Sequence, residues 1–178
     1  MSILPIVKEG DPVLRRPAGP VDKVTAEVKR LIGDMFQTMY AAPGVGLAAV
    51  QIGVPLRVIV LDTGQEDGGP LAIVNPEIVS KAGAATSEEG CLSLPGLYVG
   101  VKRAVTVTVT GLNQDGQPIT IRTQGLRARA LQHEVDHING ILIIDHLPFW
   151  QRMKAHRQIA EWKREGVWGA PRQPANAL

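Results

Sequence analysis

The chain has 178 residues, a length typical of one globular domain, and it is 44% hydrophobic and 20% charged. Its formal net charge of +2 is too small to indicate nucleic-acid binding by itself, so we expect no DNA partner. The single cysteine, Cys91, excludes an intramolecular disulfide and fits a reducing compartment. No apolar run approaches the ~20 residues that span a bilayer, and the N-terminal residues do not resemble a secretory signal. We therefore expect a soluble cytoplasmic protein with no membrane partner.

Three segments carry the signals of helices. The first 23 or so residues are rich in Pro and Gly, and we expect them to form an irregular arm over the surface. A helix is predicted after this arm; Thr25 can cap it, and it runs to about residue 42. Arg127–Asn139 is predicted as a second helix closed by Gly140. Pro148–Glu165 is predicted as a third, followed by a tail over about residues 166–178 that we expect to be mobile.

Extended segments are predicted between the first two helices. Four runs of apolar or β-branched residues predict strands: Arg57–Leu61, Leu71–Val74, Ala104–Thr110 and Pro118–Thr123. Asn75-Pro76 marks an edge or a bend, and Ile141–Ile144 is predicted as a further short strand. No linker or repeat divides the chain. The sequence therefore predicts a single α+β domain over residues 1–178, with antiparallel strands around a central helix and with an N-terminal and a C-terminal helix.

The second predicted helix carries the motif His133-Glu134-Val135-Asp136-His137. Histidines at positions i and i+4 lie on one face of a helix, so both imidazoles can bind one metal ion. Glu134 is rotated by about 100° from His133, so it can flank the open position of the metal and take a proton from bound water. The motif alone is only moderately specific, because short histidine patterns also occur on surface helices.

A catalytic metal site of this kind needs a third protein ligand. Downstream, the metzincin spacing places Ile143 where a histidine is required, and Glu161 lies in a basic segment that indicates a solvated surface charge. Upstream, Gly90 allows a tight turn before Cys91, whose thiolate is a strong ligand for zinc or ferrous iron. A zincin-type endopeptidase, which needs a downstream ligand, is the alternative at this point.

A third segment, Gly44–Gln51, contains two glycines followed by small apolar residues. It lacks the Lys and Ser/Thr of a phosphate-binding loop, so close approach of a ligand backbone is the better interpretation. Gln51 supplies a neutral amide donor at the end of this predicted strand, which suits stabilisation of an oxyanion.

Together these three segments resemble the signature motifs of the peptide deformylase family, GxGLAAxQ, EGCLS and HExDH. They stand here as Gly44–Gln51, Glu89–Ser93 and His133–His137, each matching in full and in the order of the family. The resemblance covers roughly residues 4–147. It implies hydrolysis of the N-formyl group from the N-terminal formyl-methionine of newly synthesised polypeptides, with release of formate.

The resemblance also implies the site. One divalent metal ion is expected on Cys91, His133 and His137, with ferrous iron in the cell and zinc, nickel or cobalt in preparations. Glu134 is expected to act as acid and base. The Gln51 amide and the backbone N–H of Leu92 are expected to stabilise the oxyanion, each by ~2–4 kcal/mol. A non-catalytic relative is a second alternative, but it is disfavoured because Gln51, Leu92 and Glu134 are all present.

The formyl-methionyl peptide is expected to add as an extra strand between two short segments, with the methionine side chain in an apolar pocket. The expected contacts are Gly44, Val45, Gly46, Gly96, Leu97, Tyr98 and Ala130. Arg129 lies near this pocket, so we expect its head to point outward or to pair with an acid. Glu89 requires a cation, and Arg103 is the candidate. Replacing Arg103 with Ala would then weaken metal retention or folding.

The third predicted helix is rich in basic residues. They are Arg152, Lys154, His156, Arg157, Lys163 and Arg164. Such residues form either a solvated face or a contact with ribosomal RNA, as family members are thought to make near the peptide exit.

Overall fold

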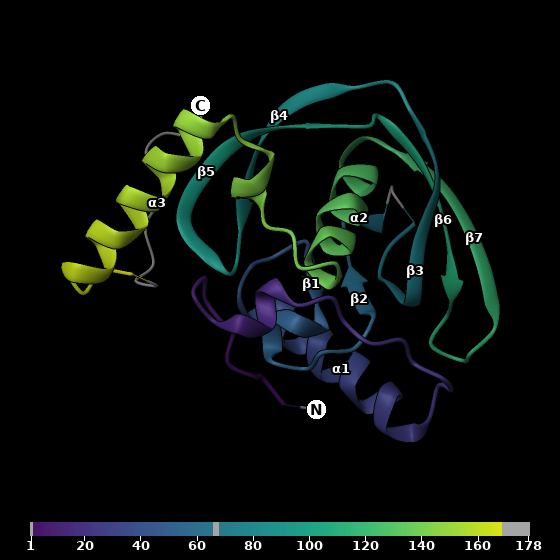
Figure 1. The fold of residues 1–178 in the computed structure, drawn as a ribbon. Helices are drawn as coiled ribbons and strands as arrows, with labels where there is room; N and C mark the ends of the chain where they lie inside the picture. Colours follow the sequence, from purple (N-terminus) through teal and green to yellow (C-terminus); the bar gives the residue numbers. More distant parts are fainter. Residues whose placement is uncertain (1, 66–67, 169–178) are drawn as a thin grey trace.

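The structure is a computed structural model and describes residues 2–65 and 68–168 (Figure 1). Its α-helices are α1 (Ala26–Ala41), α2 (Gly125–Ile138) and α3 (Phe149–Arg164). Short 3₁₀ helices are η1 (Pro12–Arg15), η2 (Ala49–Ile52) and η4 (Ile143–His146). The strands are β1 (Gly46–Ala48), β2 (Val58–Leu61), β3 (Leu71–Ala82), β4 (Ala85–Cys91), β5 (Leu94–Arg103), β6 (Thr106–Leu112) and β7 (Pro118–Gln124). The predicted α+β class is confirmed, and no helix in the described part of the chain is long and apolar enough to cross a membrane.

The strands form two separate antiparallel sheets. One contains five strands in the order β1-β2-β3-β6-β7, and the other is the β4–β5 hairpin. The predicted β6–β7 hairpin is confirmed, with Leu112 paired to Pro118 beside the turn. The β4–β5 hairpin carries Cys91 at the end of β4, so the two sheets bring separate motifs of the sequence to the surroundings of α2 (Figure 1).

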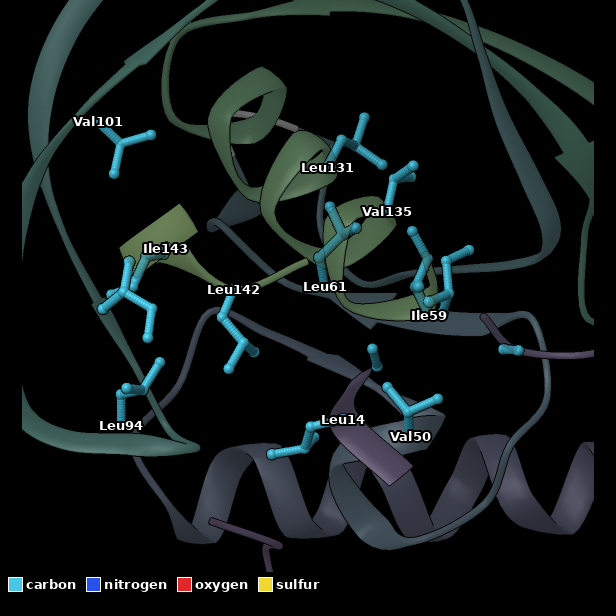
Figure 2. Close-up of a cluster of buried hydrophobic side chains, with 14 of the residues drawn as sticks. Leu14, Val50, Ile59, Leu61, Leu94, Val101, Leu131, Val135, Leu142 and Ile143 are labelled. Atoms are coloured by element: carbon cyan, nitrogen blue, oxygen red, sulfur yellow. The ribbon is translucent and has the colours of Figure 1, made fainter. Parts of the chain in front are cut away.

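Strand β2 separates two hydrophobic cores. All four of its side chains are buried, and because successive side chains of a strand point to opposite faces, they serve both cores. Val58 and Val60 pack with Met35 of α1 in one cluster. Ile59 and Leu61 pack with residues of α2, η1, β5 and η4 in the other, which Figure 2 shows.

Helix α2 is held in place because its apolar side packs into the core that contains Ile59 and Leu61. Leu131, Val135 and Ile138 are buried there. Figure 2 shows Leu131 and Val135 projecting from α2 on the side where Ile59 and Leu61 of β2 lie. The opposite side of the same helix is thereby held toward β4, which positions the polar residues of the motif.

Several sequence predictions need correction. The arm is not wholly irregular, because η1 forms where Asp11 accepts a hydrogen bond from the Val13 N–H, and it buries Leu14. The segment predicted as a strand at Ile141–Ile144 contains the start of η4 instead. Here Asp145 accepts a hydrogen bond of 2.7 Å from the Leu142 N–H, which bends the chain into a 3₁₀ turn.

Two further differences concern β3 and the chain after β3. Strand β3 continues past Asn75-Pro76 as an inner strand, with a break in pairing between Val74 and Glu77 and a positive φ at Asn75. The long β4–β5 hairpin was not predicted. Helix α3 agrees with its predicted bounds, and residues 169–178 of the predicted tail lie outside the described residues.

Candidate metal site and pocket

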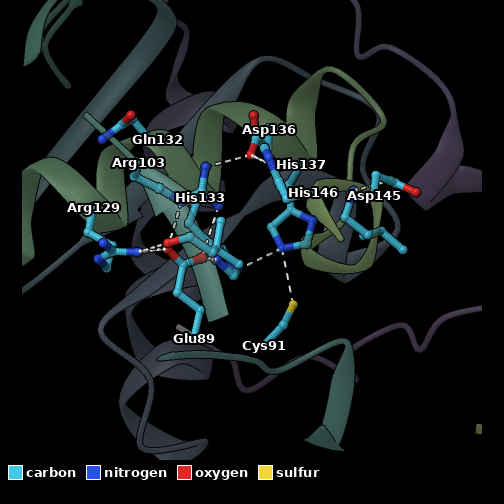
Figure 3. Close-up of polar contacts among 12 residues, drawn as sticks. Glu89, Cys91, Arg103, Arg129, Gln132, His133, Asp136, His137, Asp145 and His146 are labelled. Atoms are coloured by element: carbon cyan, nitrogen blue, oxygen red, sulfur yellow. Dashed lines mark hydrogen bonds and ion pairs between the residues drawn. The ribbon is translucent and has the colours of Figure 1, made fainter. Parts of the chain in front are cut away.

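Cys91, His133 and His137 come together at one point between the β4–β5 hairpin and α2 (Figure 3). Cys91 Sγ lies 3.2 Å from His137 Nε2, which in turn lies 3.2 Å from His133 Nε2. The three candidate ligand atoms all lie within 4.8 Å of one another. Across residues 2–65 and 68–168, no other group of three or more His, Cys, Asp or Glu side chains gathers in this way.

The chemistry of this group fits a divalent transition metal. One thiolate and two imidazoles are typical ligands of zinc and ferrous iron, and three protein ligands leave a position open. His133 Nδ1 lies 3.0 Å from Glu89 Oε2, so Nε2 is left to face the other two ligand atoms. Burial and the neighbouring His133 charge hold the pKa of His137 well below its usual value, which favours the neutral form that binds metals.

Glu89 is the centre of a buried group of charges behind His133. Arg103 donates to both of its oxygens, at 2.7 and 2.9 Å, and Arg129 Nη1 donates at 2.6 Å. Burial alone would raise the pKa of Glu89, but the hydrogen bonds from His133 and Arg103 outweigh it and lower the pKa to about 2. The expected pairing of Glu89 with Arg103 is confirmed, and Arg129 pairs with an acid as expected.

The charge group extends away from the pocket. Arg103 Nη1 also donates to Asp136 Oδ2 at 2.7 Å, and His146 Nε2 lies 2.7 Å from the same oxygen (Figure 3). Asp136 belongs to the HEVDH motif but faces the opposite way from the ligand atoms. Sequence reasoning missed this role of Asp136 and missed His146, because their contact depends on how η4 packs against α2.

Glu134 lies beside the candidate ligands in a different environment. It is buried, and its Oε2 has no hydrogen-bond partner in the described part of the structure. Burial raises the pKa of Glu134 to about 7, against the opposing effects of His133 and Arg103. A carboxyl group with such a pKa can take up and release a proton near neutral pH.

Gln51 lies in η2 rather than at the end of a strand, which corrects the sequence prediction. Its own Oε1 accepts a hydrogen bond of 2.8 Å from the Ala48 N–H, and this contact accompanies the turn of the chain after β1. The Nε2 group donates to Ser93 Oγ at 3.2 Å and lies 3.8 Å from Cys91 Sγ. The amide donor therefore faces the candidate metal site, as its expected role requires.

A pocket of about 740 Å³ opens beside these residues. Every residue predicted to contact substrate lines it: Gly44, Val45, Gly46, Gly96, Leu97, Tyr98 and Ala130. Gln51, Leu92 and Glu134 also line it, with Cys91 and His133. Sequence reasoning missed Lys8 and Leu126 in the wall, since the first lies in the arm and the second precedes the motif on α2.

Comparison with known proteins identifies the family. The model of the polypeptide deformylase family matches residues 3–153. The chain belongs to this family. A peptide deformylase of Nitrosococcus oceani is 45% identical over 164 residues, covering 92% of this chain and 98% of the relative. A peptide deformylase of Halothermothrix orenii is 54% identical over 145 residues, covering 82% and 94%.

Solved structures of polypeptide deformylases share the fold. A peptide deformylase from Legionella pneumophila is 47% identical with a TM-score of 0.86, covering 97% of this chain and all of that one. One from Ehrlichia chaffeensis, solved in complex with actinonin, is 37% identical with a TM-score of 0.87, covering 92% and 99%. The zincin alternative is not favoured, because the described third residue of the cluster is Cys91 and Glu161 is not part of it.

Proposed function

We propose that this chain is a peptide deformylase, a metal-dependent hydrolase that removes the formyl group from the N-terminal formyl-methionine of newly made polypeptides and releases formate. The observation that carries this proposal is the cluster of Cys91, His133 and His137, with Glu134 beside it in the wall of the pocket, where its Oε2 has no hydrogen-bond partner among the described residues. Membership of the polypeptide deformylase family supports the same conclusion. We also propose that residues 1–178 form a single catalytic domain in which α2 is the central, metal-binding helix.

In this proposal Cys91 Sγ, His133 and His137 hold one divalent ion, with ferrous iron in the cell and zinc, nickel or cobalt as substitutes. When bound, the ion supplies positive charge that polarises the formyl carbonyl and lowers the pKa of a water molecule. Glu89 orients the His133 ring through Nδ1 and keeps its Nε2 toward the ion.

The chain itself supplies the proton transfers and the oxyanion donors. Glu134 takes the proton from the attacking water and passes it to the departing amine as the formyl C–N bond breaks. A pKa of about 7 suits both steps near neutral pH. Gln51 Nε2 and the Leu92 N–H donate to the oxygen of the tetrahedral intermediate, and each contributes about 2–4 kcal/mol to its stabilisation.

The peptide binds along β1, the edge strand of the five-stranded sheet. The Val45 carbonyl already accepts a hydrogen bond of 2.9 Å from the Asp62 N–H. Because backbone groups alternate along a strand, Gly46 presents its N–H and C=O at the free edge. Main-chain pairing there, and with Gly96–Tyr98 across the pocket, accepts any residue after methionine.

The pocket also explains why a formyl group is accepted. A Cβ atom added at Gly46 would lie 2.9 Å from Glu134 Cδ, so Glu134 packs directly on the glycine backbone. This packing leaves no room for a further atom between Gly46 and Glu134. An acetyl group carries a methyl in place of the formyl hydrogen, and we expect it to be rejected sterically.

We further propose that α3 contacts ribosomal RNA through its exposed basic side chains, among them Lys154 and Arg157. The opposite side of α3 buries Ala155 and Ile159 in the core, so deleting the helix would damage the fold as well as the surface. Reversing the charge of Lys154 and Arg157 avoids this problem. We expect the double Glu variant to bind ribosomes more weakly at low salt, and equal binding would exclude the contact.

Release of formate from a formyl-methionyl peptide tests the main proposal. Wild type is expected to release formate, whereas Glu134→Ala loses about 10²–10⁴-fold in kcat and keeps its metal. Cys91→Ala is expected to lose the metal, whereas Glu161→Ala, the matched control, keeps both metal and activity. Loss of metal from Glu161→Ala with retention in Cys91→Ala would instead indicate a zincin. Equal activity of wild type and Glu134→Ala would exclude the mechanism.

A further inference from the structure

The turn Leu92-Ser93 between β4 and β5 lies outside the regular pairing of its hairpin. The two strands pair residue by residue from Ala85 opposite Arg103 to Gly90 opposite Tyr98. The register then shifts, and Cys91 pairs with Leu94 across the turn. The turn follows a metal-ligand candidate and carries the Leu92 N–H, which the proposed mechanism uses. Besides the Cys91–Leu94 pair, contacts from elsewhere in the chain hold it.

Those contacts come largely from the N-terminal arm. Lys8 Nζ donates to the Leu92 carbonyl at 2.9 Å, and the Glu9 N–H donates to the Ser93 carbonyl at 2.9 Å. Directly before them, the Val7 N–H donates to the Gln51 carbonyl at 2.8 Å. Three successive residues of the arm thus fasten the two segments that carry the proposed oxyanion donors.

The arm is itself anchored by α3. Lys163 Nζ donates to both the carbonyl and the carboxylate of Glu9, each at 2.9 Å. Gln51 Nε2 adds a direct link to Ser93 Oγ at 3.2 Å. The Leu92-Ser93 turn is therefore fixed on its outer side by a short network that starts at α3, and Lys8 is the member that contacts Leu92.

The placement of Lys8 is unusual for a lysine. Its side chain is partly buried in the pocket wall, and burial lowers the pKa of its ammonium group against the opposing effect of Cys91. Within residues 2–65 and 68–168 no carboxylate lies within ion-pair distance of it. A lysine that served only solubility would extend into water. Here the desolvated ammonium is instead matched to one backbone carbonyl, in a charge-assisted hydrogen bond.

We propose that Lys8 is a positioning residue, which holds the Leu92 carbonyl so that the Leu92 N–H stays directed into the pocket. The inference rests on the proposed function, in which that N–H stabilises the oxyanion. The N–H and C=O of Leu92 lie on either side of one Cα, and β4 fixes the chain only up to Cys91. Fixing the carbonyl therefore restricts rotation of the whole residue. Oxyanion donors must lie about 2.7–3.1 Å from the developing charge, so a small rotation weakens the contact.

The test compares Lys8→Met, Lys8→Arg and wild type in the zinc-loaded enzyme, with Lys23→Met on the exposed surface as the matched control. We expect Lys8→Met to lower kcat for a formyl-methionyl peptide about tenfold, with KM within about twofold and an unchanged zinc content. Lys8→Arg keeps a cationic donor and is expected to recover most of kcat. Lys23→Met is expected to match wild type.

Amide hydrogen exchange supplies a readout that does not depend on activity. In Lys8→Met we expect the Leu92 amide to exchange about tenfold faster, with the amides of β2 unchanged. Wild-type kcat together with wild-type exchange at Leu92 would overturn the proposal. Faster exchange throughout the sheets, or a loss of kcat that Lys8→Arg does not recover, would overturn it in favour of a general structural role. A wild type that releases no formate would refute the proposed function, while the exchange data would still show whether Lys8 orders the turn.

Discussion

Glu89 and Glu134 are both buried glutamates in the lining of the pocket near His133, and their surroundings differ. Glu89 contacts Arg103, Arg129 and His133, and its pKa falls to about 2. Glu134 has an oxygen without a hydrogen-bond partner in the described structure, and its pKa rises to about 7. The surroundings thus lower the pKa of a glutamate at one position and raise it at the other.

The difference separates holding a group in place from carrying out chemistry. A fully hydrogen-bonded carboxylate fixes the orientation of its neighbours, but it exchanges a proton only with difficulty. A buried carboxylate without partners costs stability, and it can bind and release a proton at neutral pH. Three substitutions test whether Glu89 serves to position its neighbours and Glu134 serves to transfer protons.

The largest effect is expected from Arg103→Ala, which removes the cation shared by Glu89 and Asp136. Breaking a buried ion pair by removing one partner typically costs about 3–5 kcal/mol, because the remaining charges stay buried. We expect a loss of this size in the free energy of unfolding, and faster loss of metal to a chelator because His133 is held less firmly. Arg122→Ala on the exposed side of β7 is the control. If Arg103→Ala kept wild-type stability and metal retention, the charged residues around Glu89 would not be needed to hold His133 in place.

A smaller effect is expected from Gly46→Ala, which alters the surroundings of Glu134 and leaves the contacts of Glu89 in place. The added Cβ overlaps the Glu134 carboxyl group and forces it to move. Displacement of a reacting group by about 1 Å can cost 10²-fold in rate, so we expect kcat to fall by up to this factor. The metal content is expected to stay at the wild-type level. Wild-type kcat would show that the position of Glu134 is not critical.

The smallest effect is expected on the stability of Glu134→Gln. The substitution replaces a carboxyl group with a neutral amide of similar shape, so we expect the free energy of unfolding at pH 5, where folded Glu134 is largely protonated, to change by no more than about 1 kcal/mol. Because the folded pKa of about 7 exceeds the unfolded value of about 4.3, ionisation of Glu134 destabilises the fold as pH rises through this range. Glu134→Gln is expected to lack that dependence. Unfolding curves at pH 5 and pH 8 measure this pH dependence. If Glu134→Gln lost as much free energy of unfolding as Glu89→Gln, the two glutamates would not differ in their contribution to stability.

The parts of the site that were predictable from sequence depend on local geometry. Two histidines four positions apart share a helix face whatever the rest of the fold does. Pairing of Glu89 with Arg103 followed from the need of a buried acid for a cation. The first of these predictions required only the periodicity of one helix, and the second required only that a buried acid be paired with a cation.

The parts that were missed depend on packing or on alternatives to regular structure. The contact of Lys8 with Leu92 joins residues 84 positions apart, and no feature of the arm sequence indicates it. Gln51 was expected at the end of a strand, but its side chain bonds to the backbone at Ala48, which favours η2. The β4–β5 hairpin was missed because much of β4 is exposed and polar, so it lacks the apolar alternation of a typical strand.

The network that fastens the Leu92-Ser93 turn has a consequence for the order of assembly. The arm is synthesised first, yet its partners are Gln51, Ser93 and finally Lys163, which lies 154 positions after Glu9. The arm can therefore dock completely only after α3 has been synthesised and has folded. The ordering of the Leu92-Ser93 turn is, by this arrangement, coupled to the folding of a helix that lies far from it in the sequence.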